Sequence, residues 1–371
     1  MLLVTVPTSR EVRALNGSKY YYLSSMSTCD WVFPDFRAFI IAQQSKSTDT
    51  DTSPTFQTPS KIRGSISWEK ERQLRLTTCT FLLDLGKILA LPSIVVISAQ
   101  YHIQRFYMVQ SFTEHDRFLV ATAALFIASK AEESKLQVRT LTEDALYLLF
   151  HTQQNFSGNP HQNRLDTRHN LELNPRSGDS QRKHVDRLHA LMEMMDTGEI
   201  ATITKKVVFY ERVLLLTLSF EIGVAHAFSH VLTQMDKVFG PDTGYDHRAY
   251  EDARMVAFTL LNDSIKHSLC VAFTSLQLAT GAVYIAVLYT QKIRVDSRSR
   301  GRKSWWSVWN LDASELKDIA KAFLWMYQDA TGQPSKFLGR KMREIWRSYD
   351  PTQGNESLYA IQRSGKDSVG V

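Results

Sequence analysis

The sequence has 371 residues, which is too long for one ordinary helical domain and fits two. Its hydrophobic fraction of 43% and charged fraction of 22% are those of a globular protein, so fibrous, collagen-like and wholly disordered classes are excluded. The formal net charge of +6 points to a nucleic-acid or acidic partner, provided that the charge is concentrated in one place. Three widely separated cysteines exclude a disulfide framework and a cysteine-rich zinc site, and favour a reducing compartment.

The first predicted element is an amphipathic helix over residues 31–44, which a polar linker follows. Residues 45–57 are rich in Ser, Thr and Asp and cannot bury an apolar face, so residues 1–57 are assigned to an N-terminal helix and linker. A first packed unit is predicted over 58–222, with helical apolar spacing in four segments, which are 74–85, 92–107, 118–129 and 141–150.

A polar insertion interrupts this first unit at about 151–184, where we expect disorder because periodic apolar positions are nearly absent. Order is expected to return with a helix over 207–220. A second unit is predicted over 223–330, with helices near 226–239, 249–265, 271–290 and 314–328. Residues 331–371 form a basic C-terminal tail. No segment alternates strongly enough to predict a strand, so the predicted fold class is all-α.

An internal repeat links the two units. Residues 121–128 and 279–286 are identical at five of eight positions, and each lies in the most apolar helix of its unit. A helix that is apolar on every face belongs at the centre of a helical cluster. The sequence therefore predicts two five-helix units, each around a small-residue central helix. Residues 268–291 carry no charge and are long enough to span a membrane, but their polar side chains favour a buried core helix, and no membrane partner is expected.

No catalytic motif stands out. Glycines spaced as Gly-x-Gly, a Walker lysine motif, a Gly-x-Ser-x-Gly elbow, a His-Glu-x-x-His zinc motif and an Asp-Phe-Gly kinase motif are all missing, so we expect no enzymatic activity and no cofactor. His226 and His230 have the i, i+4 spacing of a metal pair, but no third ligand accompanies them, and we expect no metal.

Two charged residues interrupt apolar faces. Glu211 lies within the apolar stripe of the helix over 207–220, and Lys130 ends the apolar helix over 118–129. One interpretation is a satisfied buried carboxylate and a helix-terminal lysine. The other is that both side chains lie at the edge of a groove and bind the backbone of another protein.

Several short motifs resemble those of one family, the cyclins, and in particular the transcriptional cyclins of the T, K and L types. In chain order, the matching segments are Trp31-Val32-Phe33, Thr58-Pro59-Ser60, Arg75 with Asp84-Leu85-Gly86, Gln104 to Phe112, Ala124 to Glu133, Tyr210 to Leu215 with Phe220-Glu221, Asn262-Asp263-Ser264, Lys303-Ser304-Trp305-Trp306, and Leu316 to Tyr327. The resemblance covers about 31–44 and 58–330, apart from the insertion. It implies tandem cyclin boxes, and it leaves the subtype open.

The resemblance also implies a role for individual residues. The regulatory helix of a cyclin-dependent Ser/Thr kinase would be contacted by four residues, Lys130, Glu211, Phe126 and Glu133. Binding of the chain would then activate that kinase allosterically. The kinase would act in RNA polymerase II elongation or RNA processing, and the protein would be nuclear. The family positions expected to be structural are Arg75, Gln104, Trp305 and Trp306.

Other classes remain open on the sequence alone: a general transcription factor of the TFIIB type, or a helical adaptor without a kinase partner.

The net positive charge of the chain also allows an acidic or nucleic-acid partner. Residues 292–303 contain six basic and one acidic side chain, so this loop accounts for five of the six net positive charges. Its core residues are Arg294, Arg298, Arg300, Arg302 and Lys303. Three interpretations of the loop remain open: a solvated connection, a nuclear-import signal, or a binding site for an acidic or nucleic-acid partner.

Overall fold

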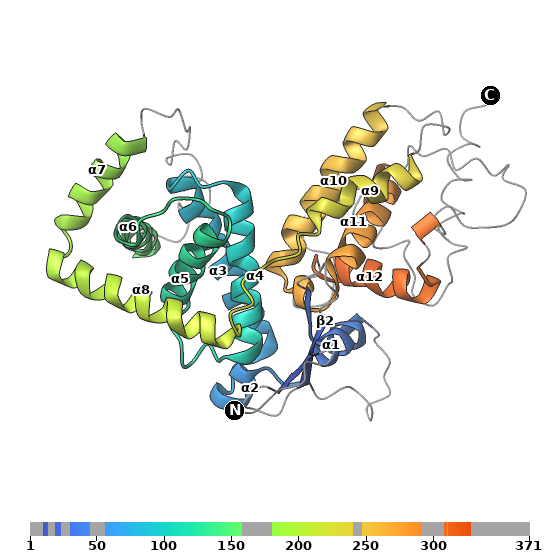
Figure 1. The fold of residues 1–371 in the computed structure, drawn as a ribbon, viewed down its shortest axis with the longest axis horizontal. Helices are drawn as coiled ribbons and strands as arrows, with labels where there is room; N and C mark the ends of the chain where they lie inside the picture. The colour runs from blue at the N-terminus through green and yellow to red at the C-terminus, as the bar shows by residue number, and fades with distance from the viewer. Residues whose placement is uncertain are drawn as a thin grey trace, which may run out of the picture. The chain divides into compact units, whose positions relative to one another are not determined.

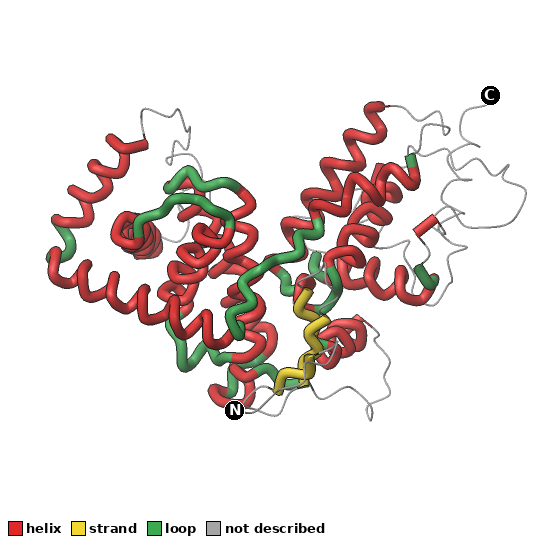
Figure 2. Tube along the Cα trace, in the orientation of Figure 1, coloured by secondary structure: helices red, strands yellow, loops and turns green. Residues whose placement is uncertain are grey.

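The computed structural model describes residues 10–13, 19–23, 30–44, 56–157, 180–239, 247–290, 308–309 and 311–327. The chain divides into two compact units (Figures 1 and 2). The central unit comprises Gln57–Val224, and the composite unit combines Met1–Phe56 with Ala225–Val371. The N-terminal segment is thus grouped with the second half of the chain.

The central unit is built from helices. In chain order these are α2 (Pro59–Gly64), α3 (Trp68–Ile88), α4 (Ser93–Val109), α5 (Arg117–Ala131), α6 (Val138–Ser157), α7 (Ser180–Met192) and α8 (Thr197–Thr217). Helix α5 lies among α3, α4, α6 and α8 (Figure 1), and it contacts all four of them. Its residues are buried continuously from Val120 to Ser129. Asp116 caps its N-terminus by accepting hydrogen bonds from the amides of Phe118 and Leu119.

The ends of the predicted insertion are helical, which corrects the expectation of disorder over 151–184. Helix α6 continues to Ser157 and α7 begins at Ser180, while 158–179 lies outside the described residues. Helix α7 is held on α6 mainly by charge. Arg187 binds both carboxylate oxygens of Asp144, at 2.7 and 3.1 Å, and His184 lies 3.2 Å from the same carboxylate. A small apolar cluster of Leu146, Leu191 and Ile200 supports the contact.

The composite unit contains α1 (Pro34–Gln44), α9 (Phe228–Val238), α10 (His247–Lys266), a 3-10 turn η2 (Leu269–Val271), α11 (Ser275–Thr290) and α12 (Ala313–Trp325). Of the five helices predicted for the second box, the described residues therefore include four, α9 to α12. Helix α1 packs against α12, and the amide of Phe33 donates to the carbonyl of Val271. These contacts explain why the N-terminal segment belongs to this unit.

The repeat predicted from the sequence corresponds to the two central helices. Helix α11 is buried from Leu278 to Val287, as α5 is in the central unit, and it contacts α9, α10 and α12. Gly281 allows α12 to approach closely, because a Cβ atom at this position would lie 2.3 Å from Cγ2 of Ile319. Within the described residues, no helix is long and apolar enough to span a bilayer.

The all-α class is confirmed for both units, but the structure adds a small antiparallel sheet that the sequence did not predict. Its strands, β1 (Arg10–Arg13), β2 (Lys19–Leu23) and β3 (Asp30–Val32), pair in chain order. The register places Glu11 opposite Tyr21, and Tyr22 opposite Trp31. Strand β3 contacts η2, so the sheet adjoins the second box.

Candidate functional site

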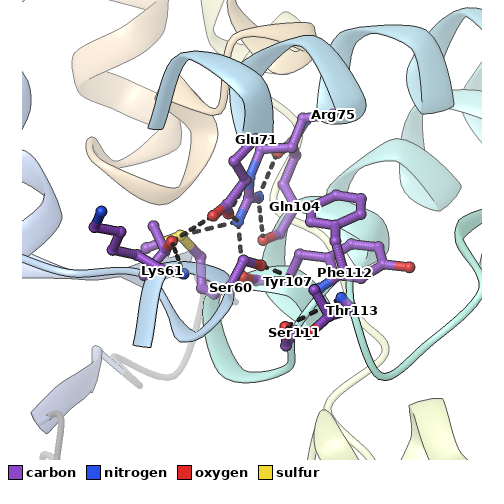
Figure 3. A network of polar contacts seen from close by, with 11 residues as sticks. Ser60, Lys61, Glu71, Arg75, Gln104, Tyr107, Ser111, Phe112 and Thr113 are labelled. Atoms are coloured by element: carbon purple, nitrogen blue, oxygen red, sulfur yellow. Dashed lines mark hydrogen bonds and ion pairs between the residues drawn. The ribbon is translucent and has the colours of Figure 1, made fainter. Parts of the chain in front are cut away.

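The two sets of residues that the family resemblance singles out lie in very different surroundings. The first set is centred on Arg75, which is almost completely buried on α3 (Figure 3). Its Nε and Nη2 atoms donate to the same oxygen of Glu71, at 3.0 and 2.7 Å. The hydroxyl of Thr58 donates to the other oxygen of that carboxylate. Both charges are therefore compensated inside the unit, as a buried ion pair requires.

The remaining donors of Arg75 hold α4 against α3. Nη1 donates to the side-chain oxygen of Gln104 at 2.9 Å, and Nη2 donates to the carbonyl of Tyr107 at 2.7 Å. Gln104 in turn donates to Sγ of Cys79, at 3.4 Å. Tyr107 stacks on Phe112 with the ring centroids 3.5 Å apart, and burial raises the pKa of its hydroxyl well above the usual value.

This network fixes the segment at which the first box begins. Ser60 accepts a hydrogen bond from the amide of Phe112, so the segment from Thr58 to Ser60 is tied to the end of α4 (Figure 3). Arg75 and Gln104 expose almost no surface to a partner. Their surroundings support the structural role that the resemblance implies for them.

In the second set, Lys130, Glu211 and Glu133 lie at the surface, where α5 ends beside α8, whereas Phe126 is buried. Nζ of Lys130 lies 2.7 Å from Oε1 of Glu211 and 4.0 Å from the ring centroid of Phe126. The lysine side chain is 54% exposed and that of the glutamate 16%. The glutamate is thus satisfied by the lysine, and the pair is accessible from outside.

The C-terminus of α5 presents a further carboxylate at this surface. Glu133 is exposed and has a φ of 52°, in the left-handed region. The amide of Ser134 donates to the carbonyl of Ser129, and that of Glu133 to the carbonyl of Lys130, which is a Schellman motif. Glu132 is used internally, because it accepts a hydrogen bond from the hydroxyl of Ser98.

The structure also shows exposed apolar residues that the sequence analysis missed. Phe209 and Leu216 on α8, and Phe220 just after it, are 58%, 62% and 65% exposed. The amide of Phe220 donates to the carbonyl of Leu215 in a second Schellman motif, and both Ser219 and Phe220 have positive φ. The run Val213 to Leu216 contains a signal for such exposure, because four consecutive apolar residues cannot all face the core of a helix.

Several predicted residues lie outside the described part of the chain. They are Trp305, Trp306, the basic-loop residues Arg294, Arg298, Arg300, Arg302 and Lys303, and the C-terminal tail. Among the described residues, no group of three or more His, Cys, Asp or Glu side chains is arranged to hold a metal ion. The described cysteines, Cys79 and Cys270, are buried and form no disulfide.

Comparisons with known proteins point to one family. Residues 43–156, which include α2 to α5 and nearly all of α6, match the cyclin N-terminal domain. Cyclin-T1-3 of Oryza sativa subsp. japonica is 24% identical over 306 residues, which are 82% of this chain and 51% of that protein. Cyclin-L1-1 of Arabidopsis thaliana is 24% identical over 269 residues, which are 72% of this chain and 53% of that protein. The chain thus spans about half the length of these two relatives.

A solved structure shows a weaker likeness. The crystal structure of the yeast RNA Pol II CTD kinase CTDK-1 complex contains a chain that is 18% identical, with a TM-score of 0.49, and the likeness covers 80% of this chain and 83% of that one. No conclusion follows from a likeness at this level. The match to the cyclin N-terminal domain and the T- and L-type relatives support a transcriptional cyclin family for this chain.

Proposed function

We propose that the chain binds and activates a cyclin-dependent Ser/Thr kinase of the transcription-associated class. The observation that carries this proposal is the exposed ion pair of Lys130 and Glu211, which joins α5 to α8 at 2.7 Å. We define the kinase-facing surface as Lys130, Glu211, Phe126 and Glu133. The chain itself performs no chemistry, and RNA polymerase II is the expected target of the kinase.

The chemistry of the pair suits the backbone of a partner helix. The ammonium group of Lys130 has three donors and Glu211 uses one of them, so further donors can bind carbonyl groups at a helix C-terminus. The second oxygen of Glu211 can accept from backbone amides. Phe126 is buried, and its ring supports the ammonium group of Lys130 from inside the unit. A partner helix held in this way is positioned without any change in the fold of the cyclin, and such positioning is what allosteric activation of a kinase requires.

The direct test is co-expression with the transcription-associated kinases of the source organism. The double variant Lys130→Ala with Glu211→Ala should co-purify with its kinase at least tenfold less efficiently, because partner groups in the interface lose their bonds. Activity on a peptide of polymerase C-terminal repeats should fall in parallel. The matched control is Lys87→Ala with Asp84→Ala, since Lys87 is also 54% exposed and its ion pair has an N–O distance of 3.0 Å. Full kinase occupancy in the Lys130 and Glu211 double variant would exclude this surface.

Two further variants separate recognition from stability. Exchanging the charges, with Lys130→Glu and Glu211→Lys, keeps an ion pair but reverses its polarity, so stability should be retained while kinase binding is lost. Glu133→Gly relieves the left-handed strain at φ 52° and removes the side chain with its carboxylate. If Glu133 contacts the kinase, this variant is at least as stable as the parent chain and binds the kinase more weakly.

A nuclear location is part of the proposal, with the basic loop as the import signal. Arg294, Arg298, Arg300, Arg302 and Lys303 concentrate positive charge in a short segment, as import signals do. Replacing all five by Gln should lower the nuclear fraction of a fluorescently tagged chain severalfold, and kinase co-purification should be unchanged. Unchanged nuclear accumulation would remove the loop from this role.

A further inference from the structure

The outer side of α8 carries a regular ridge of exposed side chains that no core contact explains. Its members are Lys205, Phe209, Arg212 and Leu216, which we call the outer ridge. Their spacing of four, three and four residues places them on one side of an α-helix. The ridge alternates a cation with a large apolar residue along about three turns.

The apolar members of the ridge are exposed to an extent that is unusual for their size. Phe209 is 58% and Leu216 62% exposed, whereas Val207, Leu214 and Leu218 in the same segment are buried. Both cations are exposed, and neither forms an ion pair with a residue that the structure describes. Exposed apolar side chains that are grouped and framed by charge mark interaction surfaces more often than isolated ones do.

The outer ridge is distinct from the kinase-facing surface. At about 100° per residue, Glu211 lies about 140–160° around the helix axis from Phe209 and Leu216. Glu211 is also turned toward Lys130 on α5, with which it pairs. A partner that contacts the pair therefore covers a different side of α8, and the ridge does not depend on the kinase proposal.

We propose that the outer ridge binds an acidic amphipathic segment of a second protein partner. The argument is charge complementarity combined with apolar spacing. A helix with apolar residues at i, i+4, i+7 and i+11 and carboxylates between them would place apolar side chains on Phe209 and Leu216, and would pair with Lys205 and Arg212. Lys206, which is adjacent and exposed, adds to the positive field.

The alternatives fit the ridge less well. A second copy of the chain would bring the same cations together across a two-fold contact, which is repulsive. The long segments outside the described residues, 158–179 and 328–371, carry at least as many basic as acidic side chains and lack the acidic pattern. Single-stranded nucleic acid prefers several aromatic platforms along a basic groove, and the ridge offers one aromatic residue.

The test uses the purified full chain and a fluorescein-labelled helical peptide with leucine at i, i+4, i+7 and i+11 and glutamate between. A second peptide carries lysine in place of glutamate, and a 15-nucleotide single-stranded RNA serves as the nucleic-acid probe. The ridge variant is Phe209→Ser with Leu216→Ser, and the charge variant is Lys205→Glu with Arg212→Glu. The matched control is Leu232→Ser with Met255→Ser, because these residues are also exposed apolar positions on helices, at 45% and 63%. Fluorescence anisotropy gives the affinity of each pair.

The proposal predicts saturable, salt-sensitive binding of the acidic peptide to the parent chain. Both ridge and charge variants should weaken it at least tenfold, the lysine peptide should bind at least tenfold more weakly, and the control variant should match the parent. Kinase co-purification should survive in the ridge variant. The proposal is overturned if the acidic peptide does not bind saturably, if the ridge variant binds it as tightly as the parent chain, or if the RNA binds more tightly than the peptide. It is also overturned if the parent chain sediments as a dimer that the ridge variant dissociates, or if the ridge variant no longer co-purifies with the kinase.

Discussion

Two ion pairs of the central unit have the same N–O distance and opposite surroundings. Arg75 and Glu71 approach to 2.7 Å with side chains 1% and 0% exposed, and Lys130 and Glu211 approach to 2.7 Å with side chains 54% and 16% exposed. The first pair connects α3 to α4 and to Thr58, the residue that caps α2, through additional hydrogen bonds. The second has no comparable set of internal partners, since the structure shows one bond between its members and a ring beside the lysine.

The difference shows that distance does not decide what an ion pair is for. A buried pair must recover the cost of removing two charges from water, and it does so only when the remaining donors and acceptors are also bonded. An exposed pair contributes little to stability but retains donors and acceptors for another molecule. The buried network therefore suits a role in the fold, and the exposed pair suits the recognition role proposed for it.

The largest effect is expected from removing one member of the buried pair. Arg75→Met should lower the free energy of unfolding by about 3–5 kcal/mol, because Glu71 is left buried without its partner. Guanidinium titration followed by circular dichroism measures the change. The double variant Arg75→Met with Glu71→Leu removes both charges and should recover part of the loss. A loss of less than 1 kcal/mol in the single variant would contradict the structural role.

A neutral member of the same network should have a smaller effect. Gln104→Ala removes an acceptor of Arg75 and a donor to Cys79, while the bonds to Glu71 remain. The expected loss is about 1–3 kcal/mol, the cost of leaving one buried polar group unsatisfied. Gln104→Glu, which is similar in shape, would show whether a second carboxylate beside Arg75 compensates. A loss as large as that of Arg75→Met would mean that the ion pair is not the dominant contact.

The exposed pair should be nearly neutral for stability. Lys130→Ala with Glu211→Ala should change the free energy of unfolding by no more than about 1 kcal/mol. Raising the salt concentration from 0.05 to about 0.5 M should reduce even this difference, because exposed charges are screened, and should leave the effect of Arg75→Met unchanged. A stability loss comparable with that of Arg75→Met would make the surface pair structural and would weaken the kinase proposal.

The sequence predicted the main helices well because their apolar spacing is strong. The central helices α5 and α11 are examples, since a helix that is apolar on all faces has only one place in a helical unit. Helix α7 was missed because it is mostly polar, and its anchor is the pairing of Arg187 with Asp144, 43 positions earlier in the chain. The strands β1 to β3 were missed because each is short and is stabilised by pairing with another segment.

Motifs in the sequence singled out the residues of the candidate site, but they did not predict which side chains contact each other or which are exposed. Spacing along the chain indicates that Lys130 and Glu211 interrupt apolar faces, and nothing in it indicates that they meet. The exposed positions of Phe209 and Leu216 depend on which side of α8 faces α5 and α6. Such facts follow from tertiary packing, which a pattern of single residues does not contain.

The titratable side chain of His115 is half-buried, so its exposure lies between those of the buried and the exposed ion pair. Its ring lies 5.3 Å from that of Phe106 and 6.0 Å from that of Tyr210, measured between centroids. Burial lowers the pKa of the imidazole below the usual 6.5, and the charge of nearby Arg63 acts in the same direction, partly opposed by Glu114. The neutral form is therefore favoured in the folded state.

The smallest expected effect is the pH dependence that this histidine contributes. Above pH 6.5 both folded and unfolded states hold a neutral imidazole, and the contribution to stability is complete. As the pH falls below 6.5 the unfolded state takes up the proton first, so stability decreases until the pH passes the lowered pKa of the folded state. His115→Phe keeps the ring contacts and removes the titration, so the variant should lose less stability than the parent chain over this interval. Thermal unfolding at several pH values measures both slopes, and a parent slope no steeper than that of the variant would show that burial does not disfavour the charged form of His115.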